Sequence, residues 1–281
     1  MKVLLGSLMA AAALIPVAGQ AGTAADDTAR RFVAQVTLPG ESDEPSARFT
    51  YPLCVGTAGL PSEAGEVIVE GIAAVAIGAG LSIAKPGCAP NLMVVFVEDS
   101  RAAVRTLSQG RSGTLVGKSP TDIGYILAEE GRARAWTLVE TRSRDGDRPR
   151  YSPTGATTLD TATSTRLSSP TRRDIVSSVV LIDREAVADR DLRQVADYAA
   201  MRGLTGARFR ALPMPQESSI LMLFTPQGDA QAPATLTAAD RAFLRAFYTV
   251  RADLTAPMQR QRITYQIARS RVADTDSTPA R

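Results

Sequence analysis

The clearest hydrophobic pattern in the sequence lies between positions 62 and 97. From Ser62 to Gly78, valine and isoleucine recur every three or four residues, which predicts a helix with one apolar face. Ser62 is a suitable N-cap, and Gly78 and Gly80 predict the end of the helix. Leu92–Val97 is a continuous apolar run rich in β-branched residues, typical of a strand covered on both faces.

Three further segments have the pattern of strands. Ala29–Leu38 alternates apolar and polar residues and predicts a first strand. Asp174–Asp183 is rich in valine and isoleucine and predicts a second buried strand. In Ala133–Tyr151, alternation followed by an aspartate–glycine turn predicts a β-hairpin. Its return arm contains Pro149, so this arm should lie at the edge of the sheet.

Helices are expected mainly in the second half of the chain. Thr237 is placed to cap one of them, Thr121 another, and Gly203 predicts the end of a third, which presents Arg202 on its outer face. Ser218–Phe224 is a short helix or a strand, because periodicity does not separate the two at this length. The predicted helices are Pro120–Gly131, Asp191–Arg202, Ala238–Val250 and Pro257–Val272.

This order of elements predicts an α+β protein, with a mixed sheet, helices packed mainly on one side and a helical C-terminal part. We expect one domain over residues 22–272, with a mobile loop rich in threonine, serine and proline near residues 153–170. Residues 273–281 should form a disordered tail.

Residues 1–21 have the pattern of a secretory signal peptide. Lys2 precedes an apolar run, Val3–Ala18, and the small residues Gly19 and Ala21 follow, where cleavage would occur. The run is short for a membrane span and contains Pro16, which disfavours the alternative of an uncleaved anchor. We therefore expect a periplasmic or secreted protein whose mature chain has no membrane span.

The two cysteines, Cys54 and Cys88, are interpreted in the light of export. In an oxidising compartment they most simply form one disulfide, which would stabilise the fold by about 3–4 kcal/mol in the chain-entropy model. The alternative is a catalytic thiol. A cysteine nucleophile normally needs a neighbouring base, and the chain contains no histidine, so the structural interpretation is favoured.

Composition excludes several functions. The 32 basic and 29 acidic residues are interspersed, so the sequence pI of about 9.1 is a weak indication of nucleic-acid binding, and we expect no nucleic-acid partner. Aromatic residues make up 5% of the chain, too few for a surface that stacks bases or sugars. The lack of histidine excludes a two-histidine zinc helix and removes the usual base of a serine or cysteine triad.

Two short segments resemble catalytic motifs. Gly113–Ser119 is similar to a phosphate-binding loop but is one residue too short for its N–H groups to converge on phosphate. Ser82–Lys85 has the serine–lysine spacing of penicillin-recognising enzymes, where the serine begins a buried helix. Here the segment runs from Gly80 into Pro86, which predicts a loop. Neither is therefore expected to be catalytic.

Paired carboxylates could in principle bind a divalent ion or perform acid–base chemistry. The two close aspartate pairs lie in turn or tail sequence and do not fit the twelve-residue calcium loop. For the other two pairs, scarce aromatic residues disfavour a sugar cleft, and charges on the outer face of a helix are usually solvated. We therefore expect no catalytic, cofactor-binding or metal-binding residue, and no cofactor. The pairs considered are Asp145 with Asp147, Asp274 with Asp276, Asp191 with Asp197, and Glu98 with Asp99.

Four segments resemble a family of uncharacterised exported bacterial proteins: Pro86–Leu92, Val179–Asp183, Gln194–Arg202 and Leu236–Tyr248. The resemblance covers most of the mature chain and implies no named activity. More distantly, the order of strand, helix and C-terminal helices is similar to that of zincin-type metalloproteases.

In zincins the helix after the strand carries the zinc-binding histidines. The corresponding helix here offers Gln194, Asp197 and Tyr198, which cannot form that site. The resemblance therefore implies an inactive scaffold. We expect an exported, non-catalytic envelope protein with a binding or assembly role and an unidentified envelope protein as its partner. The alternative is a hydrolase that uses carboxylates or a bound divalent ion.

Overall fold

The first helix, α1 (Ala18–Val36), includes the last residues of the predicted leader. Within the described part of the chain, no helix has the length and apolar character needed to cross a lipid bilayer. Much of the predicted loop near 153–170 lies outside this part, as do residues 277–281. The computed structural model describes residues 18–37, 44–110, 115, 118–151, 157–161, 165, 168–213 and 216–276.

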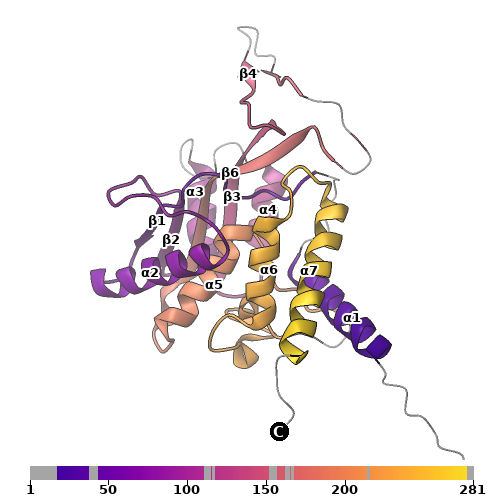
Figure 1. Ribbon diagram of the computed structural model, residues 1–281. Coiled ribbons are helices and arrows are strands. Elements are labelled where there is room, and N and C mark those ends of the chain that lie inside the picture. The colour runs from indigo at the N-terminus through magenta and orange to yellow at the C-terminus, as the bar shows by residue number, and fades with distance from the viewer. Residues whose placement is uncertain are drawn as a thin grey trace, which may run out of the picture.

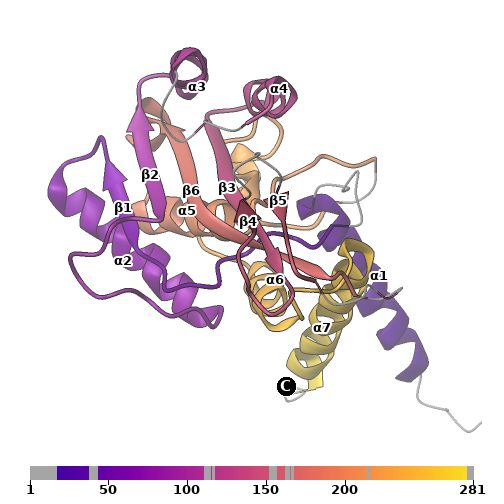
Figure 2. The ribbon, with the colours of Figure 1, turned by 90° about the horizontal axis from the view of Figure 1, so that it is seen from above.

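A mixed sheet of four strands forms the centre of the protein, in the order β1, β2, β6, β3 (Figure 2). The parallel strands are β1 (Val55–Ala58), β2 (Leu92–Val97) and β6 (Thr171–Asp183). β3 (Ala133–Ser143) pairs antiparallel with β6. The two buried strands predicted from valine and isoleucine content are confirmed. One face of β2 is fully buried and the other half-buried, which is less complete than the predicted burial on both faces.

Two helices cover one face of this sheet and contact each other, α2 (Ser62–Gly78) and α5 (Leu192–Thr205) (Figure 1). α2 connects β1 to β2 and buries the apolar face expected from its sequence, including Ile68 and Ile72. The predicted cap was wrong, because the N-cap position is Pro61 and no side chain caps the helix.

The predicted end of α5 at Gly203 was also wrong. The helix continues to Thr205, and Gly206 takes the left-handed conformation that ends it. Gly203 has a packing role instead, since a Cβ there would lie 2.8 Å from Cδ1 of Leu92. The glycine therefore allows α5 to approach the sheet closely.

The C-terminal helices α6 (Ala238–Thr249) and α7 (Ala256–Asp276) enlarge the same core together with α1 (Figure 1). Both were predicted, and Thr237 caps α6 as expected, with Asp240 completing a capping box. α7 continues to Asp276, so its last residues take the place of the first residues of the predicted tail.

The strand predicted at Ala29–Leu38 was wrong, because residues 29–36 belong to α1 and Leu38 lies outside the described residues. Four apolar residues of this segment recur at helical spacing and are at most 3% exposed, whereas Ala34 is exposed. The polar residues between them imitated the alternation of a strand. The buried residues of this stripe are Ala29, Phe32, Val33 and Val36.

The second face of the sheet is covered by α3 (Ser100–Gln109) and α4 (Pro120–Ala128), over a smaller apolar cluster that includes Trp136. α4 is capped by Ser119 in a capping box, and not by Thr121 as predicted. The larger core lies on the face covered by α2 and α5, so the α+β class with a helical C-terminal part is confirmed.

The predicted hairpin was wrong in its pairing. The turn is present, with Gly146 at φ 103°, but β3 pairs with β6 and is itself the sheet edge. β6 offers a long apolar partner, whereas the return arm is polar. β4 (Arg150–Tyr151) forms a separate pair with β5 (Thr157–Thr158).

Three short 3-10 turns complete the described structure. The middle one lies in the apolar segment 218–224, which is therefore neither α-helix nor strand, and its residues are buried. The turns are η1 (Arg184–Val187), η2 (Ile220–Met222) and η3 (Asp229–Gln231).

Candidate functional site

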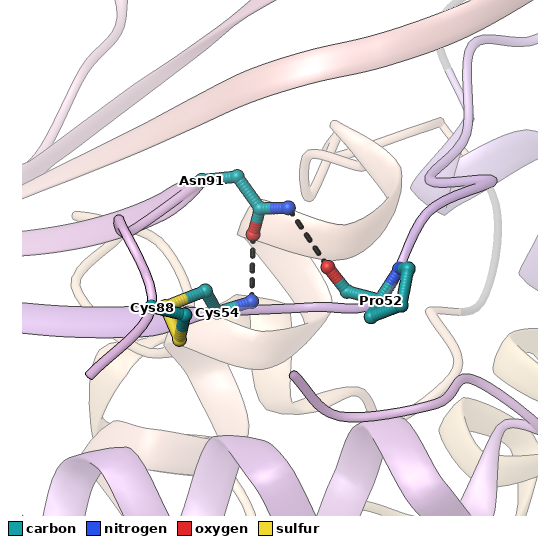
Figure 3. The surroundings of a disulfide bond; sticks show 4 residues. All are labelled: Pro52, Cys54, Cys88 and Asn91. Carbon is teal, nitrogen blue, oxygen red and sulfur yellow. Dashed lines mark hydrogen bonds between the residues drawn. A yellow bond between two sulfur atoms is a disulfide. The ribbon is translucent and has the colours of Figure 1, made fainter. Parts of the chain in front are cut away.

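The predicted disulfide between Cys54 and Cys88 is present, with a Cα–Cα distance of 6.1 Å (Figure 3). Asn91 reinforces it, because its side-chain Oδ1 accepts from the Cys54 N–H (2.8 Å) and its Nδ2 donates to the Pro52 carbonyl (3.0 Å). The disulfide and this amide together join the segments that lead into β1 and β2. Cys54 is buried beside the core, so the pair is a structural brace.

The two segments that resemble catalytic motifs have structural surroundings. Ser82 and Ala84 pair with the backbone of Leu53, so the serine–lysine segment is extended and its serine begins no helix. In the glycine-rich segment 113–119, residues 113, 114, 116 and 117 lie outside the described residues, and Ser119 caps α4.

Several of the paired carboxylates stabilise local structure. Asp99 and Asp191 cap helices, and Asp147 accepts from the Ser143 hydroxyl (2.9 Å). Asp274 and Asp276 lie in the last turn of α7. In the described part of the chain, no group of three or more histidine, cysteine, aspartate or glutamate residues is placed to hold a metal ion.

The helix compared with the zincin metal-binding helix is α5. Its polar residues fix the neighbouring segment at 233–236: Gln194 donates to the Pro233 carbonyl (2.7 Å), and Asp197 accepts from the Leu236 N–H (2.8 Å). Tyr198 is buried. These side chains position the chain that leads into α6.

A cleft of about 600 Å³ lies beside β3, and sequence analysis did not predict it. Trp136, Asp122 and Tyr125 contribute to its lining. Among the described residues that line it, five are cationic and only Asp122 is acidic. We call this site the basic cleft and define it by its cations, Lys118, Arg173, Arg202, Arg208 and Arg210.

Arg202 lies at the buried end of the basic cleft and is 3% exposed. Its Nη2 contacts Glu129 Oε2 at 2.6 Å, and Arg208 Nη2 contacts Glu129 Oε1 at 2.7 Å. One carboxylate thus serves two guanidinium groups. The Arg202 Nε is also buried and has no hydrogen-bond partner among the described residues.

The segment after α5 positions the arginines. Gly206 reverses the chain, and Arg202 Nη1 then donates to the Ala207 carbonyl at 2.9 Å. The backbone N–H groups of Arg208 and Arg210 donate to carbonyls of α1 at 3.1 and 3.0 Å. These bonds hold the backbone of the segment, while the Arg210 side chain has no hydrogen-bond or ion-pair partner in the part of the chain that the structure describes.

Glu129 is held by α4, of which it is the C-cap residue, and not by the segment that carries the arginines. Its carbonyl accepts from Arg101 (3.1 Å) and from Arg134 (3.0 Å), and Arg134 also donates to the Ser100 hydroxyl (2.5 Å). α3, α4 and β3 therefore all contribute to its position. Because Glu129 is held in place, its carboxylate cannot also neutralise the other cations of the basic cleft.

The pKa shifts reflect burial and neighbouring charge. Burial lowers the pKa of Arg208, an effect that Glu129 partly offsets. Burial also lowers the pKa of Lys118, with Asp122 opposing the shift and Arg173 adding to it. Burial raises the pKa of Tyr198, so its phenol is a neutral hydrogen-bond donor at neutral pH.

A second cavity of about 340 Å³ shares Arg202, Arg208 and Arg210 with the basic cleft. Phe224 lines it in a left-handed conformation, φ 66°, and such strain costs about 1–3 kcal/mol. Its carbonyl accepts from the Arg132 N–H (3.0 Å). Gly131 passes so close that a Cβ there would lie 2.0 Å from the same carbonyl oxygen.

The basic cleft is suited to binding an anion, because it concentrates fixed positive charge around a partly enclosed space. Arg202 was predicted on the outer face of its helix, and this was wrong. The spacing of Arg202, Arg208 and Arg210 within one short stretch is the sequence signal that could have indicated the site. Its other parts come from distant segments.

Comparisons with protein-family models, with curated proteins and with solved structures found no match to this chain.

Proposed function

We propose that this protein is an exported binding protein that takes an anionic ligand in the basic cleft. The single observation that carries the proposal is the excess of positive charge among the residues that line the cleft. Glu129 balances part of the charge of Arg202 and Arg208, whereas the Arg210 side chain has no partner in the described part of the chain. An anion would relieve this imbalance in a half-buried site, where charge interactions are stronger than in water.

Two observations support the exported location. Positions 1–21 have the pattern of a cleaved leader, and Cys54 is joined to Cys88. The proposal includes a binding partner in the envelope, whose recognised group is negatively charged. Mass spectrometry of the mature protein should find the leader removed and no thiol that can be alkylated without reduction.

The cleft contains its own reporter of binding. Trp136 is the only tryptophan in the chain, and it lines the cleft. Titration with sulfate, inorganic phosphate or citrate should change its fluorescence in a saturable manner. Sodium chloride at matched ionic strength separates specific binding from screening. A response that follows only ionic strength would contradict the proposal.

Arg210→Ala should weaken binding of the most effective of these anions by about tenfold or more, because a hydrogen bond to a charged group contributes about 1.5–3 kcal/mol. The urea midpoint should change little, since the Arg210 side chain makes no hydrogen bond or ion pair with a described residue. Arg262→Ala, at an exposed position of α7, is the matched control and should bind as the native protein does. Equal affinity in both variants would rule out the basic cleft as the binding site.

A further inference from the structure

The edge strand β3 has one row of backbone groups that face away from the sheet. The Asp183 N–H donates to the Arg132 carbonyl at 2.9 Å, which sets the alternation of the ladder between β3 and β6. Counting from this pair, the N–H and C=O groups of Ala133, Ala135 and Thr137 point away from β6. β3 ends the order of strands, so no strand among the described residues pairs with this row.

This free edge lies along the basic cleft. Ala135, Trp136 and Thr137 line it, together with α4 and the segment after α5 (Figure 2 shows β3 at the edge, with α4 near the start of the strand). Natural sheets usually protect an edge with proline or inward charges, or cover it. Here Ala135 is 6% exposed and Thr137 half-buried, because α4 and the segment after α5 cover part of this edge. The cleft of about 600 Å³ between them is the space that a further strand, about 4.8 Å away, would occupy.

The charge of the cleft indicates the chemistry of such a strand. Alternate side chains of an extended peptide lie on one face, about 7 Å apart. Lys118, Arg208 and Arg210 come from two separate segments beside the edge. Glutamate or aspartate at alternate positions of a peptide would meet these cations, while its backbone pairs with β3.

We propose that the ligand of the basic cleft is an extended acidic segment of a partner protein, which adds to the free edge of β3 as a fifth strand. This inference rests on the proposed function and specifies its ligand. The backbone of Ala135 and Thr137 supplies the pairing, and Lys118, Arg208 and Arg210 select acidic side chains. Sequence specificity would come from the alternate positions that face the cleft.

The test uses the full mature protein and a capped six-residue peptide that alternates glutamate and valine. Trp136 fluorescence should report saturable binding of this peptide. Two matched peptides should bind at least tenfold more weakly: one with glutamine in place of glutamate, and one methylated on the backbone nitrogens that face β3. Equal binding of the methylated peptide would overturn strand addition.

Hydrogen exchange followed by NMR gives a second measurement. The N–H groups of Ala135 and Thr137 should exchange at least tenfold more slowly when the glutamate peptide is bound. Thr137→Pro removes one outward donor without removing a bond to β6, so it should abolish peptide binding, whereas Thr137→Val retains the donor and should bind normally. Unchanged exchange at both positions in the presence of saturating peptide would overturn the inference.

The outcomes separate the two proposals. If phosphate or citrate binds and is lost in Arg210→Ala, but the glutamate peptide does not bind, strand addition is wrong and anion binding stands. If no anion and no peptide binds, both are wrong. Sedimentation should show a monomer without peptide; dimers that are abolished by Thr137→Pro would show instead that a second copy of this chain occupies the edge.

Discussion

Two clusters of carboxylates and arginines lie at different places along the pair β3 and β6, and they differ in their balance of charge. Near the start of β6, Asp174 contacts Arg172 (3.1 Å) and Arg142 (3.4 Å), and Glu140 also contacts Arg142 (2.5 Å). Near the start of β3, Glu129 contacts two arginines of the basic cleft, and no second carboxylate in the described ranges contacts either of them.

The charges of the Asp174 cluster are therefore balanced within the protein, although Asp174 Oδ1 and Arg172 Nε form an ion pair without a hydrogen bond. Asp174 also accepts from the Thr50 hydroxyl (2.9 Å), and Tyr51 lies against the Arg142 guanidinium with its ring centroid 5.1 Å away. Both clusters adjoin a cleft, since Glu140 and Arg142 line one of about 710 Å³, but only the Glu129 cluster has an excess of positive charge. The comparison teaches that buried ion pairs alone do not indicate a binding site; an excess of one charge beside accessible space does.

The largest expected effect comes from removing the carboxylate of the cleft cluster. Glu129→Gln should lower the free energy of unfolding by about 3–5 kcal/mol, because Arg202 is then buried without a counter-charge. Asp174→Asn should destabilise less, since Glu140 still pairs with Arg142. Urea unfolding of both variants measures the difference.

Added phosphate sharpens this test. It should restore part of the stability of Glu129→Gln, because the anion reaches Arg202 and Arg208 through the cleft. It should have a smaller effect on Asp174→Asn, because Glu140 remains there as a counter-charge for Arg142. An equal gain in both variants and in the native protein would show a general salt effect instead.

The disulfide lies near the β1 end of the sheet, opposite the edge formed by β3. Replacing both Cys54 and Cys88 by serine should lower the free energy of unfolding by about 3–4 kcal/mol in the chain-entropy model. Binding of anions at the basic cleft should not change at a temperature where the variant is folded. Loss of binding in the folded variant would indicate that the two edges are coupled.

The smallest expected effect is on the pH dependence of binding. Burial lowers the pKa of Lys118 below the usual lysine value of about 10.4, with Asp122 opposing the shift and Arg173 adding to it. The affinity for sulfate, whose charge is constant over this range, should therefore fall as the pH rises from 7 to 9.5, because the ammonium group loses its proton.

Lys118→Arg keeps the charge over this range and provides the control. Its affinity should remain constant between pH 7 and 9.5, while that of the native protein decreases by a factor of a few. The same decrease in both proteins would assign the pH dependence to another group.

The parts of the fold that were predicted correctly have local signals. α2, β2 and β6 each show their period within one short segment, and Thr237 lies directly before the helix it caps. The pairing of β3 could not be predicted, because an apolar strand distant in sequence competes with the nearest polar arm. The segment predicted as a strand within α1 shows that a pattern of ten residues can fit both the strand period and the helix period.

The candidate site was missed because its residues are distant in sequence. Lys118 precedes α4, Arg173 lies on β6, and Arg208 follows α5. Only folding brings them together. Arg202 was assigned to a solvated face by its charge, whereas Glu129 allows it to be buried. Cys54 and Cys88 were found because two cysteines permit a single intramolecular pairing.

The contact between Gly131 and the Phe224 carbonyl has a consequence for how this protein can diversify. Position 131 has φ 91° and no space for a methyl group, so random mutagenesis with selection for folded protein should recover only glycine there. The cations of the basic cleft are free of this restriction. Substitutions among these cations could therefore change which ligand the cleft binds, while the close approach of Gly131 to the Phe224 carbonyl is retained.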